Sequence, residues 1–137
     1  MPRAMERADT EAVTPIRRVV VPVGGTAREF VAQEQAIEMA AALRVPVLAL
    51  HISADPDRAP ADTFEYVEKL AEKWGVPFDS EILADMEPAE RLVNELDAVD
   101  LLVIGTRRMG RKYHFGSVAE HLLQKATCLI QVVRLDA

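Results

Sequence analysis

Short apolar runs rich in β-branched residues alternate along this chain with longer segments in which apolar residues recur at helical spacing. The short runs are each bounded by glycine, proline or polar residues, which is typical of buried strands. They occupy residues 17–23, 46–53, 77–83, 100–106 and 128–135. The longer segments predict amphipathic helices. They span residues 26–44, 62–75, 88–96 and 117–126.

Five strands that alternate with four helices predict an α/β fold, a single parallel sheet with helices on both faces, because a parallel crossover needs a helix-sized connection. The run 77–83 alternates apolar with polar residues and is expected near a sheet edge. Ligands of such folds lie at the carboxyl ends of the strands, where the strand order reverses. The segments that follow the first and fourth strands, 24–28 and 105–117, are therefore the candidate ligand loops.

Helix starts are predicted at three capping boxes, in which a side chain before the helix and an acidic residue three positions later satisfy the first amides. Gly75 is expected to end the second helix and Pro88 to begin the third. The boxes pair Thr26 with Glu29, Asp62 with Glu65, and Ser117 with Glu120.

The length of 137 residues suits one domain, expected over residues 16–137 after a polar, flexible tail at 1–15. A net charge of -6 argues against a nucleic-acid partner, since such binding needs a broad basic face. The chain has no run of the roughly 20 apolar residues of a membrane span, and no membrane contact is expected.

Cys128 is the only cysteine and is interpreted as a buried, inert thiol. The single cysteine and the lack of a membrane span favour a cytoplasmic location for the protein.

The fourth strand leads into a basic segment, GTRRMGRKYHFGS, that stands out in an acidic protein. Its crowded cations favour contact with an anion, although a solvated basic turn also accounts for them. Gly116 and Ser117 open a helix whose first amides have no internal partner and attract phosphate. Ser117 either closes its own helix or meets a phosphate oxygen. The basic residues are Arg107, Arg108, Arg111 and Lys112.

No nucleophile, acid and base stand at spacings that suggest catalysis, and any turnover is expected to be slow. His51 is interpreted as a hydrogen-bonded structural histidine, and Tyr113 and His114 as surface or packing residues. The basic segment is not a P-loop, because Arg111 and Lys112 stand where lysine and a hydroxyl residue are needed.

The chain from Arg17 to Leu135 resembles the universal stress protein family. The residues that carry the resemblance are VVVPVGG at 19–25, VLALHIS at 47–53, DLLVIGTRR at 100–108 and GSVAEHLLQKATCLIQVV at 116–133. The resemblance implies a Rossmann-like sheet of the adenine nucleotide alpha hydrolase type, with strand order 3-2-1-4-5. It also implies a homodimer paired through residues 128–135 and, in many members, a bound ATP or related adenine nucleotide.

Matched position by position, the resemblance implies three groups of nucleotide contacts. Residues after the first strand would border the base and ribose, a backbone group of the second strand would face the adenine, and residues of the fourth strand would line the floor. The phosphates would meet amides at the start of the last helix and nearby guanidinium groups. These residues are Pro22, Val23, Gly24, Ile52, Ile104, Gly105, Arg107, Arg108, Gly110, Arg111, Gly116, Ser117 and Val118.

The chain departs from the nucleotide-binding members at two places. Arg108 replaces a glycine within a segment that is shorter than usual, with Gly110 as the substitute, and Gly24 replaces an aspartate that contacts the nucleotide and a metal. The missing carboxylate makes a requirement for Mg²⁺ doubtful. Two functions therefore stay open: a regulatory module that binds an adenine nucleotide, and a nucleotide-free dimer that acts through protein contacts.

Overall fold

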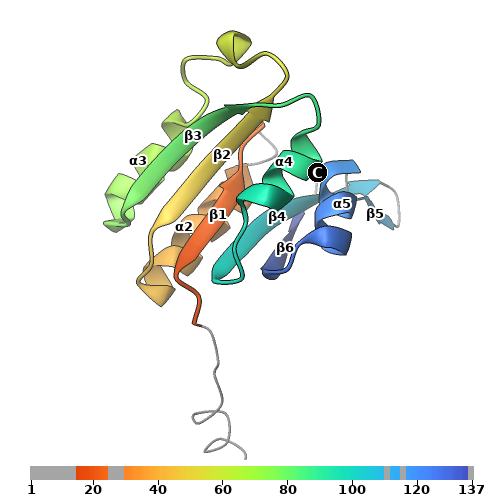
Figure 1. Cartoon of the computed structure of the whole chain (residues 1–137). Coiled ribbons are helices and arrows are strands. Elements are labelled where there is room, and N and C mark those ends of the chain that lie inside the picture. The colour runs from red at the N-terminus through yellow and green to blue at the C-terminus, as the bar shows by residue number, and fades with distance from the viewer. Residues whose placement is uncertain (1–14, 25–29, 110–111, 115–116, 136–137) are drawn as a thin grey trace, which may run out of the picture.

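The computed structural model describes residues 15–24, 30–109, 112–114 and 117–135 (Figure 1). Side chains at 58, 107–109, 112–114, 117–119 and 135 are outside the description. Helices and strands alternate along the chain as the sequence predicts. In chain order the elements are β1 (Arg18–Pro22), α2 (Phe30–Leu43), β2 (Val47–Ser53), the 3-10 helix η2 (Pro56–Arg58), α3 (Glu65–Trp74), β3 (Phe78–Ala84), α4 (Pro88–Glu95), β4 (Asp100–Met109), β5 (Lys112–His114), α5 (Ser117–Lys125) and β6 (Leu129–Leu135).

The parallel part of the sheet has the order β3-β2-β1-β4-β6, which confirms the predicted fold class and the strand order 3-2-1-4-5. Val20 of β1 pairs with Leu48 of β2 and with Leu102 of β4, so β1 lies in the middle of the sheet. β3 forms one edge, as its alternating pattern predicts, and exposes Ile82.

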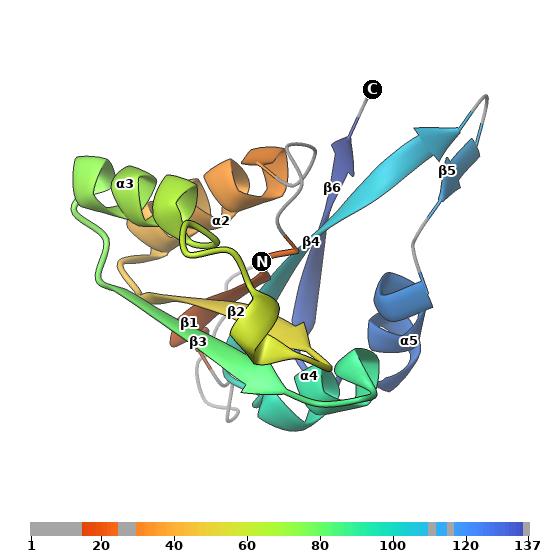
Figure 2. The ribbon, with the colours of Figure 1, turned by 90° about the horizontal axis from the view of Figure 1, so that it is seen from above.

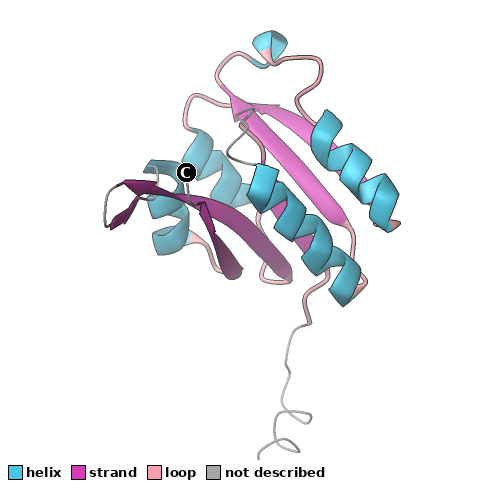
Figure 3. Ribbon diagram, turned by 180° about the vertical axis from the view of Figure 1, so that it is seen from behind, coloured by secondary structure: helices cyan, strands magenta, loops and turns pink. Residues whose placement is uncertain are grey.

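Helices cover both faces of the sheet. α2 and α3 pack on one face around Val19, Val21 and Val103, whereas α4 and α5 pack on the other around Val20 and Leu102. Figure 2 shows the two helical layers on opposite sides of the strands, and Figure 3 shows the α2–α3 layer from behind. Val19, Val20 and Val21 of β1 are all buried and apolar, because adjacent residues of this strand pack into different cores. None of the helices within the described residues has the length and apolarity that a membrane crossing requires.

The predicted loop 105–117 is wrong in part, because β4 does not stop at residue 106. β4 extends to Met109, and β5 returns antiparallel to it, with Arg107 opposite His114 and Met109 opposite Lys112. Arg107 also pairs with Leu135 of β6. β6 therefore supports β4 well beyond the point where β1 ends. β6 pairs with one edge of β4. β5 pairs with the opposite edge, near the carboxyl end of β4, and β1 pairs with that same edge near the amino end.

The predicted cap of α3 is also wrong. Phe64 occupies the N-cap position and no side chain caps the helix, while the amide of Glu65 donates to the carbonyl of Asp62 at 3.1 Å. The turn at 60–63 uses these groups, so Asp62 does not reach the helix as a cap. Gly75 does end α3, in a left-handed conformation with φ 69°, and Pro88 does begin α4. Thr26 and Glu29 lie outside the described residues.

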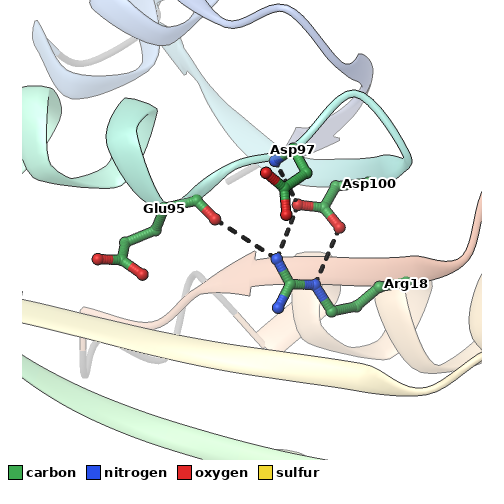
Figure 4. Close-up of polar contacts among 4 residues, drawn as sticks. All are labelled: Arg18, Glu95, Asp97 and Asp100. Atoms are coloured by element: carbon green, nitrogen blue, oxygen red, sulfur yellow. Dashed lines mark hydrogen bonds and ion pairs between the residues drawn. The ribbon is translucent and has the colours of Figure 1, made fainter.

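An ion pair joins β1 to β4 at the amino ends of the strands (Figure 4). Arg18 donates from Nε and Nη2 to the two carboxylate oxygens of Asp100, at 2.9 and 2.8 Å. Asp100 also accepts from the amide of Asp97 at 2.8 Å, and Arg18 reaches the carbonyl of Glu95 at 3.4 Å. The hydrogen bonds to Asp100 raise the pKa of Arg18. Asp100 is only 1% exposed, yet both of its oxygens are satisfied.

Replacing Asp100 with alanine is expected to lower the free energy of unfolding by about 2 kcal/mol, because it leaves a partly buried guanidinium without its partner. The loss stays below that of a fully buried pair, since the Arg18 side chain is 30% exposed. Urea unfolding followed by circular dichroism measures it. Glu65→Ala is the control. It breaks an exposed, solvent-screened pair with Lys69 and should cost much less than the loss of Asp100. Equal losses in both variants would contradict the assignment.

Candidate functional site

The carboxyl end of β1 is fixed to β2 by two hydrogen bonds. The amide of Val23 donates to the carbonyl of Leu50 at 2.8 Å, and Nδ1 of His51 donates to the carbonyl of Val23 at 2.6 Å. Because a carbonyl only accepts, this bond places the Nδ1 proton on the ring. His51 is thus a hydrogen-bonded structural histidine, as predicted. The chain leaves β1 in a defined direction, with Val23 buried and Gly24 exposed.

The carboxyl half of β4 brings a buried hydroxyl to the same end of the sheet. Thr106 is 2% exposed, and its Oγ1 has no hydrogen-bond partner among the described residues. It follows Ile104 and Gly105 on the strand that leads to the β4–β5 hairpin. The sequence reasoning did not select Thr106, although a hydroxyl residue directly after a strand-end glycine was visible.

The structure brings together six of the predicted site residues at the carboxyl ends of three neighbouring strands. Continuing the β1–β4 register places the end of β1 beside Ile104 and Gly105. Ile52 lies beyond the last β1–β2 pair and packs in the α4–α5 layer. These six residues are Pro22, Val23, Gly24, Ile52, Ile104 and Gly105.

The remaining predicted residues can be placed only in part. Arg107 and Arg108 lie on β4, and Ser117 and Val118 begin α5, with their side chains outside the description. Three further residues lie outside the described residues altogether. They are Gly110, Arg111 and Gly116.

A cavity of about 320 Å³ opens between α2 and α3, next to the end of β1. This volume lies at the lower end of the range of small-molecule pockets. Val23 is the predicted site residue that borders the cavity, and it links the cavity to the carboxyl end of the sheet. The other lining residues come from α2, from α3 and from the connection before α3. They are Phe30, Gln33, Pro60, Asp62, Thr63, Glu65, Tyr66 and Lys69.

Gln33 is the residue of this cavity that sequence reasoning should have found. It follows Phe30 by three positions and precedes Ile37 by four, so it falls on the apolar face predicted for α2. In the structure Gln33 is 2% exposed, and its Oε1 has no hydrogen-bond partner among the described residues. A polar residue that interrupts an apolar face was the available signal.

Two aromatic rings form one wall of the cavity. Phe30 of α2 stacks on Tyr66 of α3, with ring centroids 4.1 Å apart and an interplanar angle of 15°. The hydroxyl of Tyr66 donates to the carboxylate of Glu34, and this bond raises the pKa of Tyr66. The stack and the hydrogen bond hold α2 and α3 together where the cavity opens.

The charged groups around the cavity are mainly acidic. Asp62 and Glu65 carry carboxylates, and Nζ of Lys69 donates to Oε1 of Glu65 at 2.7 Å, which raises the pKa of Lys69 and lowers that of Glu65. The cavity therefore presents little positive potential to a phosphate. Within the described residues, no three His, Cys, Asp or Glu side chains gather as metal ligands.

Cys128, directly before β6, is half-buried against the α4–α5 core. Burial raises the pKa of its thiol, and the nearby charge of Asp100 acts in the same direction. Both effects lower the fraction of thiolate at neutral pH. The structure thus supports the interpretation of an unreactive thiol.

The family model described as the universal stress protein family matches residues 65–134, just over half of the chain. The chain is 28% identical over 140 residues to a universal stress protein of Methanocaldococcus jannaschii, a match that covers 86% of this chain and 82% of that protein. The fold is similar to that of a universal stress protein from Archaeoglobus fulgidus, with a TM-score of 0.70 and 26% identity over 85% of this chain and 98% of that one.

Two further structures share the fold at lower identity. A universal stress protein in complex with cAMP has a TM-score of 0.72 and 21% identity over 88% of this chain and 98% of that one. The universal stress protein from Archaeoglobus fulgidus in complex with dAMP has a TM-score of 0.64 and 22% identity over 88% of this chain and 99% of that one.

The raised pKa of Cys128 predicts slow modification of the native thiol by Ellman's reagent. At pH 8 the native protein should react at least about threefold more slowly than the same protein in urea, because less thiolate is present and access is reduced. The native rate should continue to rise above pH 9, where a free cysteine is already mostly ionised. A native rate equal to the denatured rate at pH 8 would show that the thiol is neither buried nor shifted.

Proposed function

The chain belongs to the universal stress protein family, and we propose from this premise that it binds an adenine nucleotide as a regulatory ligand at the carboxyl ends of β1 and β4. The observation that carries the proposal is the cavity of about 320 Å³ bordered by Val23, directly beside the point where β1 and β4 lead to opposite helical layers. Proteins of the same fold hold cAMP and dAMP.

The distribution of charge supports one orientation of the nucleotide. Asp62 and Glu65 at the cavity disfavour the phosphates there, whereas Arg107 and Arg108 lie on β4 beyond the end of β1. α5 begins at Ser117, and the first amides of a helix attract anions. The phosphates would then lie toward the hairpin and α5, and the base toward the cavity.

The second candidate is a nucleotide-free module that acts through protein contacts. It is favoured by Gly24, which brings no carboxylate to the end of β1, and by the strand pairing within the segment expected to be a phosphate loop. Under this alternative, Arg107 and Arg108 would serve a protein partner. A cytoplasmic location and the absence of more than slow hydrolysis stay predictions under both candidates.

Titration with ATP, ADP and AMP is expected to give binding in the micromolar to millimolar range, with affinity that falls as salt is added. Arg107→Ala combined with Arg108→Ala should weaken ATP binding by about tenfold, because it removes the positive charge that β4 carries beyond the end of β1. Isothermal titration calorimetry measures the affinities, and native mass spectrometry of the purified protein identifies any ligand retained from the cell.

Lys73→Ala is the matched control for the arginine variant. Lys73 is an exposed cation in the last turn of α3, at the opposite end of the sheet from the strand carboxyl ends, and its removal should leave the affinity unchanged. Absence of binding at millimolar nucleotide would defeat the nucleotide proposal and leave the protein-contact module as the function.

We also propose that two copies of the chain associate through β6. This strand pairs with β4 on one side, and no strand within the described residues pairs with its other side. Its apolar side chains are exposed at Leu129 (61%) and Val132 (38%). An open edge with apolar side chains is a surface that stable proteins cover, and a second copy of β6 is the occupant that the family resemblance implies.

Light scattering after size exclusion is expected to give the mass of a dimer for the unmodified protein. Leu129→Asp combined with Val132→Asp should shift the mass to that of a monomer, because the charges oppose each other across the strand pair. The control is Ile82→Asp, which changes an exposed apolar residue on β3, the opposite edge of the sheet. A dimer that survives the β6 variant, or dissociates in the β3 variant, would contradict the assignment.

A further inference from the structure

The amide of Gln33 is an unusual group to find in the α2–α3 cavity, because buried side-chain oxygens nearly always have a hydrogen-bond partner. Gln33 lies in the first turns of α2, lines the cavity and is 2% exposed. Its Oε1 has no partner among the described residues. The oxygen itself is buried, so a group that enters the cavity can supply its partner once the amide turns toward the cavity.

Three side chains of the cavity wall donate hydrogen bonds to groups other than Gln33. The hydroxyl of Thr63 donates to the carbonyl of Pro60 at 2.5 Å. The hydroxyl of Tyr66 donates to Glu34, and Nζ of Lys69 donates to Glu65 at 2.7 Å. None of these three hydrogen bonds goes to Gln33, and we take the occupant of the cavity as the source of the missing donor.

The chemistry of the wall restricts the occupant further. The carboxylates of Asp62 and Glu65 disfavour a phosphate, while the aromatic rings of Phe30 and Tyr66 suit an apolar or flat molecule. A primary amide that offers one acceptor and one donor side by side matches the edge of adenine, where the 6-amino group donates and N7 accepts. Hypoxanthine carries an oxygen at position 6 and offers no donor there.

We infer that Gln33 selects the base of the bound nucleotide by pairing its side-chain amide with the 6-amino group and N7 of adenine inside the α2–α3 cavity. This inference rests on the proposed binding of an adenine nucleotide and adds the residue that sets base specificity. Val23 borders both the cavity and the β1 end of the site, so a base held by Gln33 stays connected to phosphates near β4. Gln33 acts here as a binding residue.

The test compares ATP with ITP, which differ at position 6 of the base, on the full chain by isothermal titration calorimetry. Unmodified protein should bind ATP at least about tenfold more tightly than ITP, as expected for a good two-bond contact to a base edge. Gln33→Leu should reduce this ratio to about threefold or less while ITP affinity changes little. ATP with carbon in place of N7 should also bind the unmodified protein several-fold more weakly than ATP, and Gln33→Leu should remove that difference.

Gln35→Leu is the matched control, because Gln35 belongs to the same helix, contacts Glu38 and does not line the cavity. It should leave the ATP-to-ITP ratio unchanged. Thermal unfolding of each variant reports whether it is folded. If Gln33→Leu does not fold, Gln33→Asn repeats the comparison, since it keeps an amide but withdraws it by one methylene, and it should lower the ratio.

The outcomes separate this inference from the proposed function. Equal affinity of the unmodified protein for ATP and ITP, or a ratio that persists in folded Gln33 variants, would overturn the role of Gln33 and leave nucleotide binding intact. Failure of every nucleotide to bind would overturn both. A ratio that falls in the Gln33 variants and holds in Gln35→Leu supports the inference.

Discussion

The parallel pairing of β1 with β4 is the constraint on which the rest of this structure depends. The chain leaves β1 toward α2 on one face of the sheet and leaves β4 toward α5 on the other, because each strand feeds a different helical layer. Because the two connections diverge, the backbone leaves a space beyond the carboxyl ends of β1 and β4. The end of β1, the cavity beside it and the hairpin of β4 and β5 are all arranged around this divergence.

Within the described residues, buried polar groups are paired near the amino ends of β1 and β4 and unpaired near the carboxyl ends. At the amino ends, Asp100 is 1% exposed and both its oxygens are bound by Arg18 and Asp97. At the carboxyl ends, Thr106 and Gln33 are each 2% exposed, and each has a side-chain oxygen without a partner among the described residues. Pairing at the amino ends stabilises the fold, whereas a buried oxygen without a partner lowers stability.

Periodicity in the sequence was sufficient to predict the parallel sheet, its helices and its β3 edge, because these depend on local alternation of apolar residues. The hairpin was missed because strand pairing is non-local. From the local sequence, Arg107 and Arg108 are predicted in a loop. Their strand conformation depends on the pairing of β4 with β6 and β5, which are distant or later in the chain. Asp62 was a reasonable cap by spacing, but the turn after Pro60 uses its backbone. Gln33 lay on a face that was evaluated for its apolar members alone.

The effect of Gln33 on the packing of α2 is clearest in comparison with an apolar residue at the same position. Ala32, Ala36 and Ile37 bury the neighbouring surface of α2, and a leucine at position 33 would extend that core at no cost in unpaired polar groups. Glutamine instead leaves an acceptor without a partner among the described residues, while Tyr66 and Lys69 of the cavity wall donate to carboxylates. Because Gln33 gains no such bond within the described residues, a ligand that enters the cavity is the compensation that we propose.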